Sequence, residues 1–248
     1  MIEVRSLVKS FGSHRVLDGV SLRVEKGESV VIIGRSGGGK SVLLKHLIGL
    51  VQPDAGEVLI DGENIARLNE RELLRVRRRF GMLFQGAALF DSLTVAENVG
   101  FVLAREKQHT AAEVAKAVEE ALEMVELPGT QSKKPSELSG GMRKRVGLAR
   151  AIVYRPEIVL YDEPTTGLDP IVSDSIDQLI MRVNQHLNVT SVVVTHDMRT
   201  ARRVGHRILM LHQKRMYVSD TPENLFHSTD PVVRQFIDGV SDPKEHNL

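Results

Sequence analysis

The pattern of apolar positions along the chain predicts an α/β fold. Continuous apolar runs at residues 29–33, 80–84, 158–161 and 191–195 indicate short buried strands, of the kind found in parallel sheets. The alternation of apolar and polar residues over 20–24 instead indicates a strand with one solvated face. Helical stretches separate these runs, which is the order expected when helices cover a mostly parallel sheet.

Shorter elements fill the first third of the chain. Residues 2–4 and 57–60 have strand character, and Asp61-Gly62 after the second of these is a hairpin signal. Residues 69–79 are highly charged and predict an exposed helix. Segment 1–33 therefore reads as short strands joined by turns.

The character of the sequence changes at about residue 86 and becomes helical. Thr110 and Glu113 form a capping box, so a helix should begin there and continue through Val125 until Pro128-Gly129 ends it. We expect a helical subdomain over roughly 86–155, inserted in the α/β core.

Further helices are expected after Gly141, near 171–187, and in the tail. Thr221 with Pro222, and Asp230 with Pro231, each resemble a helix start with proline at the first helical position.

Composition narrows the functional classes. The 248 residues carry a net charge of +1, 42% hydrophobic residues, 4% aromatic residues and no cysteine. The absence of cysteine excludes disulfides and cysteine-ligated metal centres. The near-zero net charge gives no overall sign of nucleic-acid binding. No apolar run approaches the ~20 residues of a membrane span, and the N-terminus does not resemble a signal peptide, so any membrane span is expected to come from another subunit.

The glycine-rich segment after the strand at 29–33 carries the strongest chemical signal. It reads Gly34-Arg35-Ser36-Gly37-Gly38-Gly39-Lys40-Ser41 and matches the G-x-x-x-x-G-K-[ST] pattern of a P-loop, followed by a helix over 42–48. Its backbone N–H groups are expected to hold phosphates at the helix N-terminus. Lys40 should reach the β- and γ-phosphates of ATP, and the Ser41 hydroxyl should bind Mg²⁺.

A second signal is a pair of carboxylates at the end of the strand 158–161. Asp162 is expected to hold Mg²⁺, and Glu163 to polarise the water that attacks the γ-phosphate. Alone, an Asp-Glu pair after a strand also fits a solvated acidic turn. Together with the P-loop it predicts an ATPase.

With these motifs in this order, the chain resembles the nucleotide-binding subunits of ATP-binding cassette (ABC) transporters. The resemblance implies a P-loop NTPase fold with a RecA-like core, an antiparallel β subdomain and a helical subdomain. It implies that Gln85 links Mg²⁺ to a transmembrane partner and that His196 holds the γ-phosphate. The remaining positions that it implies are Phe11 for adenine stacking, Ser139, Gly140 and Gly141 for contacts to ATP bound by the opposite subunit, and Asp169 for the dimer seam.

Some positions have a plainer alternative reading. Phe11 also fits a core residue, and the basic run 75–79 invites a nucleic-acid or lipid-headgroup reading, although a solvated helix face is the simpler one. Met142 departs from the family, in which glutamine is usual after Ser-Gly-Gly. Because Ser139 and Gly141 carry the phosphate contacts in that family, ATP binding should survive the change.

Segments 34–45, 86–95, 142–145 and 230–239 resemble one subfamily, the Mla-type (MlaF-like) phospholipid-trafficking ATPases. That resemblance implies a homodimer closed by two ATP molecules on the cytoplasmic face of a bacterial inner membrane. It implies an MlaE-like permease, an MCE-domain protein and in some cases a STAS-domain subunit as partners. It also implies an ATPase domain over 1–220 and a helical tail over 221–248, of which residues 228–243 would reach across the dimer.

Two alternatives stay open from the sequence. One is the same ATPase serving another cargo, such as an amino acid, a lipoprotein or a metal. The other is a soluble ABC ATPase that acts on DNA or ribosomes. Such relatives carry a long coiled-coil insertion or two cassettes, and neither is seen in this sequence.

Overall fold

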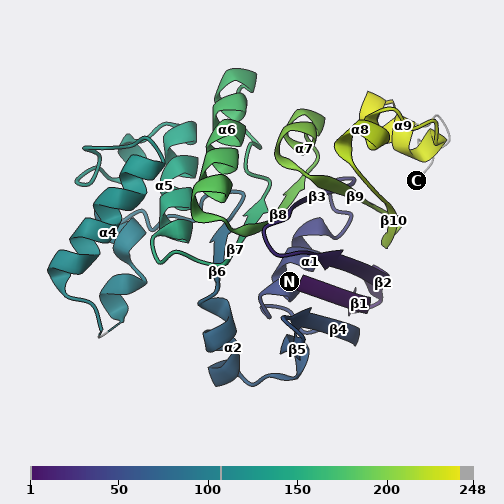
Figure 1. The fold of residues 1–248 in the computed structure, drawn as a ribbon, viewed down its shortest axis with the longest axis horizontal. Coiled ribbons are helices and arrows are strands. Elements are labelled where there is room, and N and C mark those ends of the chain that lie inside the picture. The colour runs from purple at the N-terminus through teal and green to yellow at the C-terminus, as the bar shows by residue number, and fades with distance from the viewer. Residues whose placement is uncertain (1, 107, 241–248) are drawn as a thin grey trace.

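The computed structural model describes residues 2–106 and 108–240, which form two sheets with helices packed around them (Figure 1). The strands are β1 (Ile2–Phe11), β2 (His14–Val24), β3 (Ser29–Ile33), β4 (Ala55–Ile60), β5 (Glu63–Asn64), β6 (Phe80–Leu83), β7 (Ile158–Asp162), β8 (Thr190–Thr195), β9 (Arg207–His212) and β10 (Arg215–Asp220). The α-helices are α1 (Lys40–Leu47), α2 (Glu70–Arg77), α3 (Val95–Gly100), α4 (Ala111–Met124), α5 (Gly140–Ile152), α6 (Pro170–Leu187), α7 (Met198–Val204), α8 (Pro222–Phe226) and α9 (Pro231–Asp238). Short 3₁₀ turns are η1 (Ile65–Arg67), η2 (Leu103–Arg105) and η3 (Pro135–Glu137).

The larger sheet has the strand order β10-β9-β3-β8-β7-β6. Strands β9, β3, β8, β7 and β6 run parallel, and only the edge strand β10 is antiparallel to its neighbour within this sheet. Every residue of β3, β7 and β8 is buried, as the continuous apolar runs predict, because helices cover both faces of the sheet. The α/β prediction is confirmed.

Two hydrophobic clusters lie on opposite faces of this sheet, and strand β3 contributes to both. Val31 and Ile33 point into the cluster that includes α5 and α6, while Val30 and Ile32 point into the cluster that includes α1 and the first sheet. Burial on both faces fixes the register of β3. The loop that follows β3 therefore leaves the sheet at a defined place.

The smaller sheet is antiparallel and has the order β2-β1-β4-β5. Its strands are longer than the sequence analysis predicted, because β1 and β2 contain bulges that let the pairing continue past irregular positions. The predicted hairpin between β4 and β5 is present, and its turn residues Asp61 and Gly62 both have positive φ, at 49° and 85°.

The predicted helical insert lies at one end of the molecule, where α4 and α5 pack beside the β6 edge of the larger sheet (Figure 1). The Thr110–Glu113 capping box is present at the start of α4, and a second capping box, Thr94–Glu97, begins α3. Among the described residues, no helix has the length and apolar character needed to cross a membrane.

The sequence analysis predicted no element between His196 and Asp220, where the structure has α7, β9 and β10. Strand β9 completes the parallel sheet beside β3. In the tail, Thr221 and Asp230 cap α8 and α9 with proline at the first positions, as predicted. Of the segment expected to cross the dimer, residues 241–243 lie outside the described part of the chain.

Candidate functional site

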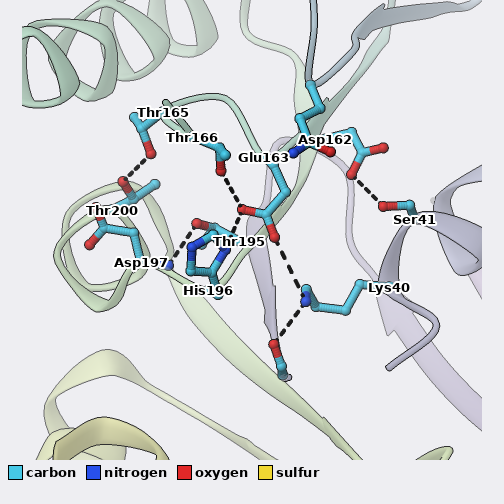
Figure 2. Close-up of polar contacts among 12 residues, drawn as sticks. Lys40, Ser41, Asp162, Glu163, Thr165, Thr166, Thr195, His196, Asp197 and Thr200 are labelled. Carbon is cyan, nitrogen blue, oxygen red and sulfur yellow. Dashed lines mark hydrogen bonds and ion pairs between the residues drawn. The ribbon is translucent and has the colours of Figure 1, made fainter. Parts of the chain in front are cut away.

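The carboxyl ends of β3, β7 and β8 meet at one edge of the larger sheet. Ile33 pairs with Thr195, and Asp162 pairs with Val194, so the loops that follow these strands begin side by side. This edge is where open parallel sheets bind ligands. The sequence motifs that were far apart along the chain come together here (Figure 2).

The glycine-rich loop between β3 and α1 has a conformation that needs glycine. Gly34 has φ 155°, and a Cβ there would lie 2.5 Å from the carbonyl oxygen of Leu211. Gly39 caps α1 in a left-handed conformation with φ 98°. The loop therefore presents the N-terminus of α1, with its unpaired N–H groups and positive dipole end, to the cavity beside it.

Lys40 is the first residue of α1 and is almost fully buried, with 5% exposed. Its ammonium donates to the carbonyl oxygens of Gly34 and Arg35, at 2.8 and 3.0 Å. It also lies 3.7 Å from Oε1 of Glu163. Burial lowers the pKa of Lys40, and the carboxylates of Glu163 and Asp162 act in the opposite direction. These carboxylates favour the charged form that phosphate binding needs.

Ser41 and Asp162, which are both predicted to bind Mg²⁺, are in direct contact. The Ser41 hydroxyl donates to Oδ1 of Asp162 at 2.7 Å (Figure 2). A hydroxyl and a carboxylate at this separation offer two hard oxygen ligands, which suit Mg²⁺ with its remaining positions taken by phosphate and water. The residues present therefore fit the ion.

Glu163 lies at the centre of the cluster (Figure 2). Oε2 lies 2.8 Å from Nδ1 of His196 and accepts a hydrogen bond from the Thr166 hydroxyl at 3.0 Å. The residue is buried and has φ 49°, a left-handed conformation that is uncommon outside glycine. Such strain is typical of functional positions, and here it turns the carboxylate toward Lys40 and His196.

The cavity at this edge has a volume of about 390 Å³. Its lining comes from the β1–β2 hairpin, the glycine loop and the ends of the parallel strands, and consists of Phe11, His14, Val16, Ser36, Gly37, Gly39, Lys40, Ser41, Val42, Gln85, Glu163 and His196. Phe11 is half exposed at the mouth, which argues against the core alternative and suits stacking on a flat ring.

Four predicted residues lie elsewhere. Ser139, Gly140 and Gly141 begin α5 and do not line this cavity, and the Ser139 hydroxyl accepts from the N–H of Met142 as the helix N-cap. Asp169 is exposed and caps α6 by accepting from the N–H groups of Ile171 and Val172. Within one chain these positions have structural explanations, so their nucleotide contacts stay a prediction about a second copy.

Several contributors to this region were not predicted from the sequence, among them Val42 on α1, which also lines the cavity. His14 and Val16 line the cavity because the β1–β2 hairpin folds over the glycine loop. Lys144, on α5, is buried and donates to the main-chain carbonyl of Glu163. A lysine within an amphipathic helix gives no sign of burial in the sequence, so only the fold reveals it.

The fold and this cluster define a nucleotide-hydrolysing P-loop protein. Comparison with known proteins agrees: the family description "ABC transporter" matches residues 17–166. The chain belongs to the ABC transporter family of ATP-binding subunits, and the ATPase prediction is confirmed at this level.

Relatives and solved structures extend the likeness over nearly the whole chain. The chain is 45% identical to the probable ribonucleotide transport ATP-binding protein mkl of Mycobacterium leprae, over 96% of this chain and 69% of the relative. It is 42% identical to the intermembrane phospholipid transport system ATP-binding protein MlaF of Haemophilus influenzae, over 98% and 92%. Among solved structures, a dimeric ATP-binding cassette in a post-hydrolysis state with ADP and Pi matches with TM-score 0.81 and 35% identity, over 90% of this chain and 99% of that one.

Proposed function

We propose that this chain is the ATP-hydrolysing subunit of a transporter that moves phospholipid between membranes. It works as a homodimer at the cytoplasmic face of a bacterial inner membrane. Its partners are an MlaE-like permease, an MCE-domain protein and, where present, a STAS-domain subunit. The observation that carries the enzymatic part is that Lys40 and His196 both contact the buried carboxylate of Glu163.

In this proposal Glu163 is the general base. It accepts a proton from the water whose oxygen bonds to the γ-phosphorus, while the bond from that phosphorus to the β,γ-bridging oxygen breaks and ADP leaves. Lys40 stabilises the charge on the transferred group, and His196, in contact with Glu163, holds the carboxylate and the γ-phosphate in line. Ser41, Asp162 and Gln85 would hold Mg²⁺, which would neutralise phosphate charge when bound.

The dimer explains the exposed positions of Ser139 and Asp169. Ser139 lies at the N-terminus of α5, and Gly140 and Gly141 follow it with N–H groups at the helix start. When a second copy is apposed, this terminus would bind the γ-phosphate held by the first copy. ATP then favours the closed dimer, because it binds that state better than the separated chains.

The permease is proposed to dock on a groove between α2 and the helical insert. The groove has a volume of about 980 Å³ and exposes two apolar side chains, Leu74 and Val102, which are 58% and 39% exposed. Arginines surround these residues, at positions 71, 75, 77, 78, 105 and 155. An amphipathic segment with acidic residues at its edges fits this lining.

The cargo is proposed from the relatives. The MlaF relative matches over nearly its whole length, and it is named for intermembrane phospholipid transport. The mkl relative is described instead as a probable ribonucleotide transporter, so cargo is the part of the proposal that needs a direct test.

The test is to purify a tagged Glu163→Gln variant from its own membranes in the presence of ATP and to identify co-purifying chains by mass spectrometry. The matched control is Glu123→Gln, an exposed carboxylate on α4. The first variant should trap the ATP-bound complex, and the control should not.

A polytopic permease with an MCE-domain protein supports phospholipid transport. A permease with another kind of binding protein would keep the mechanism and overturn the cargo. Ribosomal or DNA-bound partners without a membrane protein would contradict the transporter assignment.

A further inference from the structure

Helix α5 contacts the two loops that carry Gln85 and Glu163 through one buried basic side chain. Lys144 is 6% exposed, and its ammonium donates to the carbonyl oxygen of Glu163 at 3.0 Å and to the carbonyl oxygen of Gln85. These bonds join three segments that are distant in sequence. One is the helix that Ser139 begins, and the other two contribute Gln85 and Glu163 to the lining of the cavity.

The same face of α5 contacts the segment around Gln85 at two further points. One turn beyond Lys144, Gly147 packs so closely that a Cβ there would lie 2.9 Å from Leu83 and 3.1 Å from Ala87. Arg150 then donates to the carbonyl oxygens of Ala87 and Ala88, at 2.8 and 2.7 Å. The loop is thus held by hydrogen bonds to its backbone carbonyls and by close packing of its side chains on Gly147.

Both loops contain residues in the left-handed backbone conformation, which needs stabilising contacts from its surroundings. Ala87 and Ala88 have φ of 59° and 49°, and Glu163 has φ of 49°. Left-handed residues other than glycine cost about 1 kcal/mol or more each and require surroundings that hold them. Lys144 supplies part of this support to both loops at once.

Burial of an ammonium is unfavourable, and burial lowers the pKa of Lys144 while the carboxylates of Glu163 and Asp162 favour its charged form. An apolar side chain at this position would avoid the desolvation. The buried charge therefore points to a role for the two carbonyl contacts beyond packing.

We infer that Lys144 is a positioning residue that couples the orientation of α5 to the placement of Gln85 and of Glu163. When Ser139 at the start of α5 engages ATP, the helix brings the carbonyls of both loops with it. Lys144 thereby sets the rate of hydrolysis and not the affinity for ATP. This inference rests on the roles proposed above for Glu163 and Gln85.

The test compares Lys144→Met, which has similar length without donor or charge, with Lys144→Arg, which keeps both. The control is Lys116→Met, an exposed lysine on α4. Steady-state ATPase rates of the full chain give kcat and KM, equilibrium binding gives ATP affinity, and hydrogen exchange reports the N–H of Ala87, which bonds to the Phe84 carbonyl.

Lys144→Met is expected to lower kcat about tenfold with KM and ATP affinity within twofold of wild type, because a small misplacement of reacting groups affects the chemical step most. Exchange at Ala87 should quicken. Lys144→Arg should recover most of kcat, and Lys116→Met should match wild type in every assay.

A kcat for folded Lys144→Met within twofold of wild type would overturn the inference, as would equal losses of kcat and ATP affinity. If Lys144→Met does not fold, Lys144→Leu provides the same comparison, again without donor or charge. Wild-type turnover by Glu163→Gln would instead refute the proposed role of Glu163, whatever Lys144 does.

Discussion

Asp177 is a buried carboxyl whose charge should make the stability of this protein fall as pH rises. It lies on α6, is 3% exposed, and lines a cavity with Asp197 and Asp174. Its Oδ2 accepts from the Thr200 hydroxyl at 2.9 Å, and its Oδ1 has no hydrogen-bond partner within the described part of the chain. Burial, opposed by the Thr200 bond and reinforced by the Asp197 charge, raises the pKa of Asp177 to about 7.

The direction of the Asp177 pKa shift determines whether stability rises or falls with pH. The pKa of Asp177 in the folded state lies above its ordinary value of 3.8, so folding favours the protonated form. The stabilisation is complete below the ordinary value and is lost as pH rises to about 7. Between these two values each pH unit lowers the free energy of unfolding by about 1.4 kcal/mol. Because the loss ends near the folded pKa of about 7, raising the pH from about 5.5 to 8 lowers the unfolding free energy by up to about 2 kcal/mol. Screening by water in the cavity brings the expected loss to about 1–2 kcal/mol.

Asp177→Asn removes this titration and keeps the shape of the side chain. We expect the difference in unfolding free energy, variant minus wild type, to grow by about 1–2 kcal/mol from about pH 5.5 to pH 8, measured by urea unfolding. An unpaired amide adds a cost that does not depend on pH, so it cancels in this comparison. Asp174→Asn, on the same helix but half-exposed and paired with Arg203, is the control and should follow the wild-type slope. A difference that stays constant or shrinks with pH would refute the reasoning.

Three further predictions concern the nucleotide and the tail. Lys40→Ala should weaken ATP binding at least tenfold because it removes the charge that faces the phosphates, and tight binding by this variant in a filter or fluorescence assay would argue against the P-loop assignment. Phe11→Ala should weaken ATP binding severalfold while Phe11→Trp restores it, since stacking needs only a flat ring; equal effects of both would point to a packing role. Truncation after Ser228 should weaken dimer assembly, measured by sedimentation, and unchanged dimerisation and activity would remove the proposed tail contact.

The sequence was enough to predict most of the residues that meet around the cavity at the sheet edge. Glycine loops and strand-terminal carboxylates are local patterns, and parallel pairing of buried strands brings them to one edge whatever the rest of the chain does. Ser41 and Asp162 lie far apart in sequence, yet their contact follows from β3 and β7 ending at the same edge.

Other features depend on packing that no local pattern encodes. Strand β9 was missed because its apolar run follows a charged helix, and only pairing with β3 shows it to be the neighbour of the glycine loop. The burial of Lys144 depends on how closely α5 approaches the Gln85 loop, which the absence of a Cβ at Gly147 permits. The cap at Asp169 is different, because Asp169-Pro170 repeats the helix-start pattern of Asp230-Pro231 and is visible in the sequence.

The central claim is that ATP joins two copies of this chain, each completing the site of the other. The most direct test is sedimentation of Glu163→Gln with and without ATP, alongside the double variant that adds Ser139→Ala. We expect Glu163→Gln to change from monomer to dimer when ATP is added. The double variant should bind ATP with similar affinity as a monomer and dimerise weakly. A monomeric Glu163→Gln at saturating ATP, or a double variant that dimerises as well as the single one, would contradict the claim.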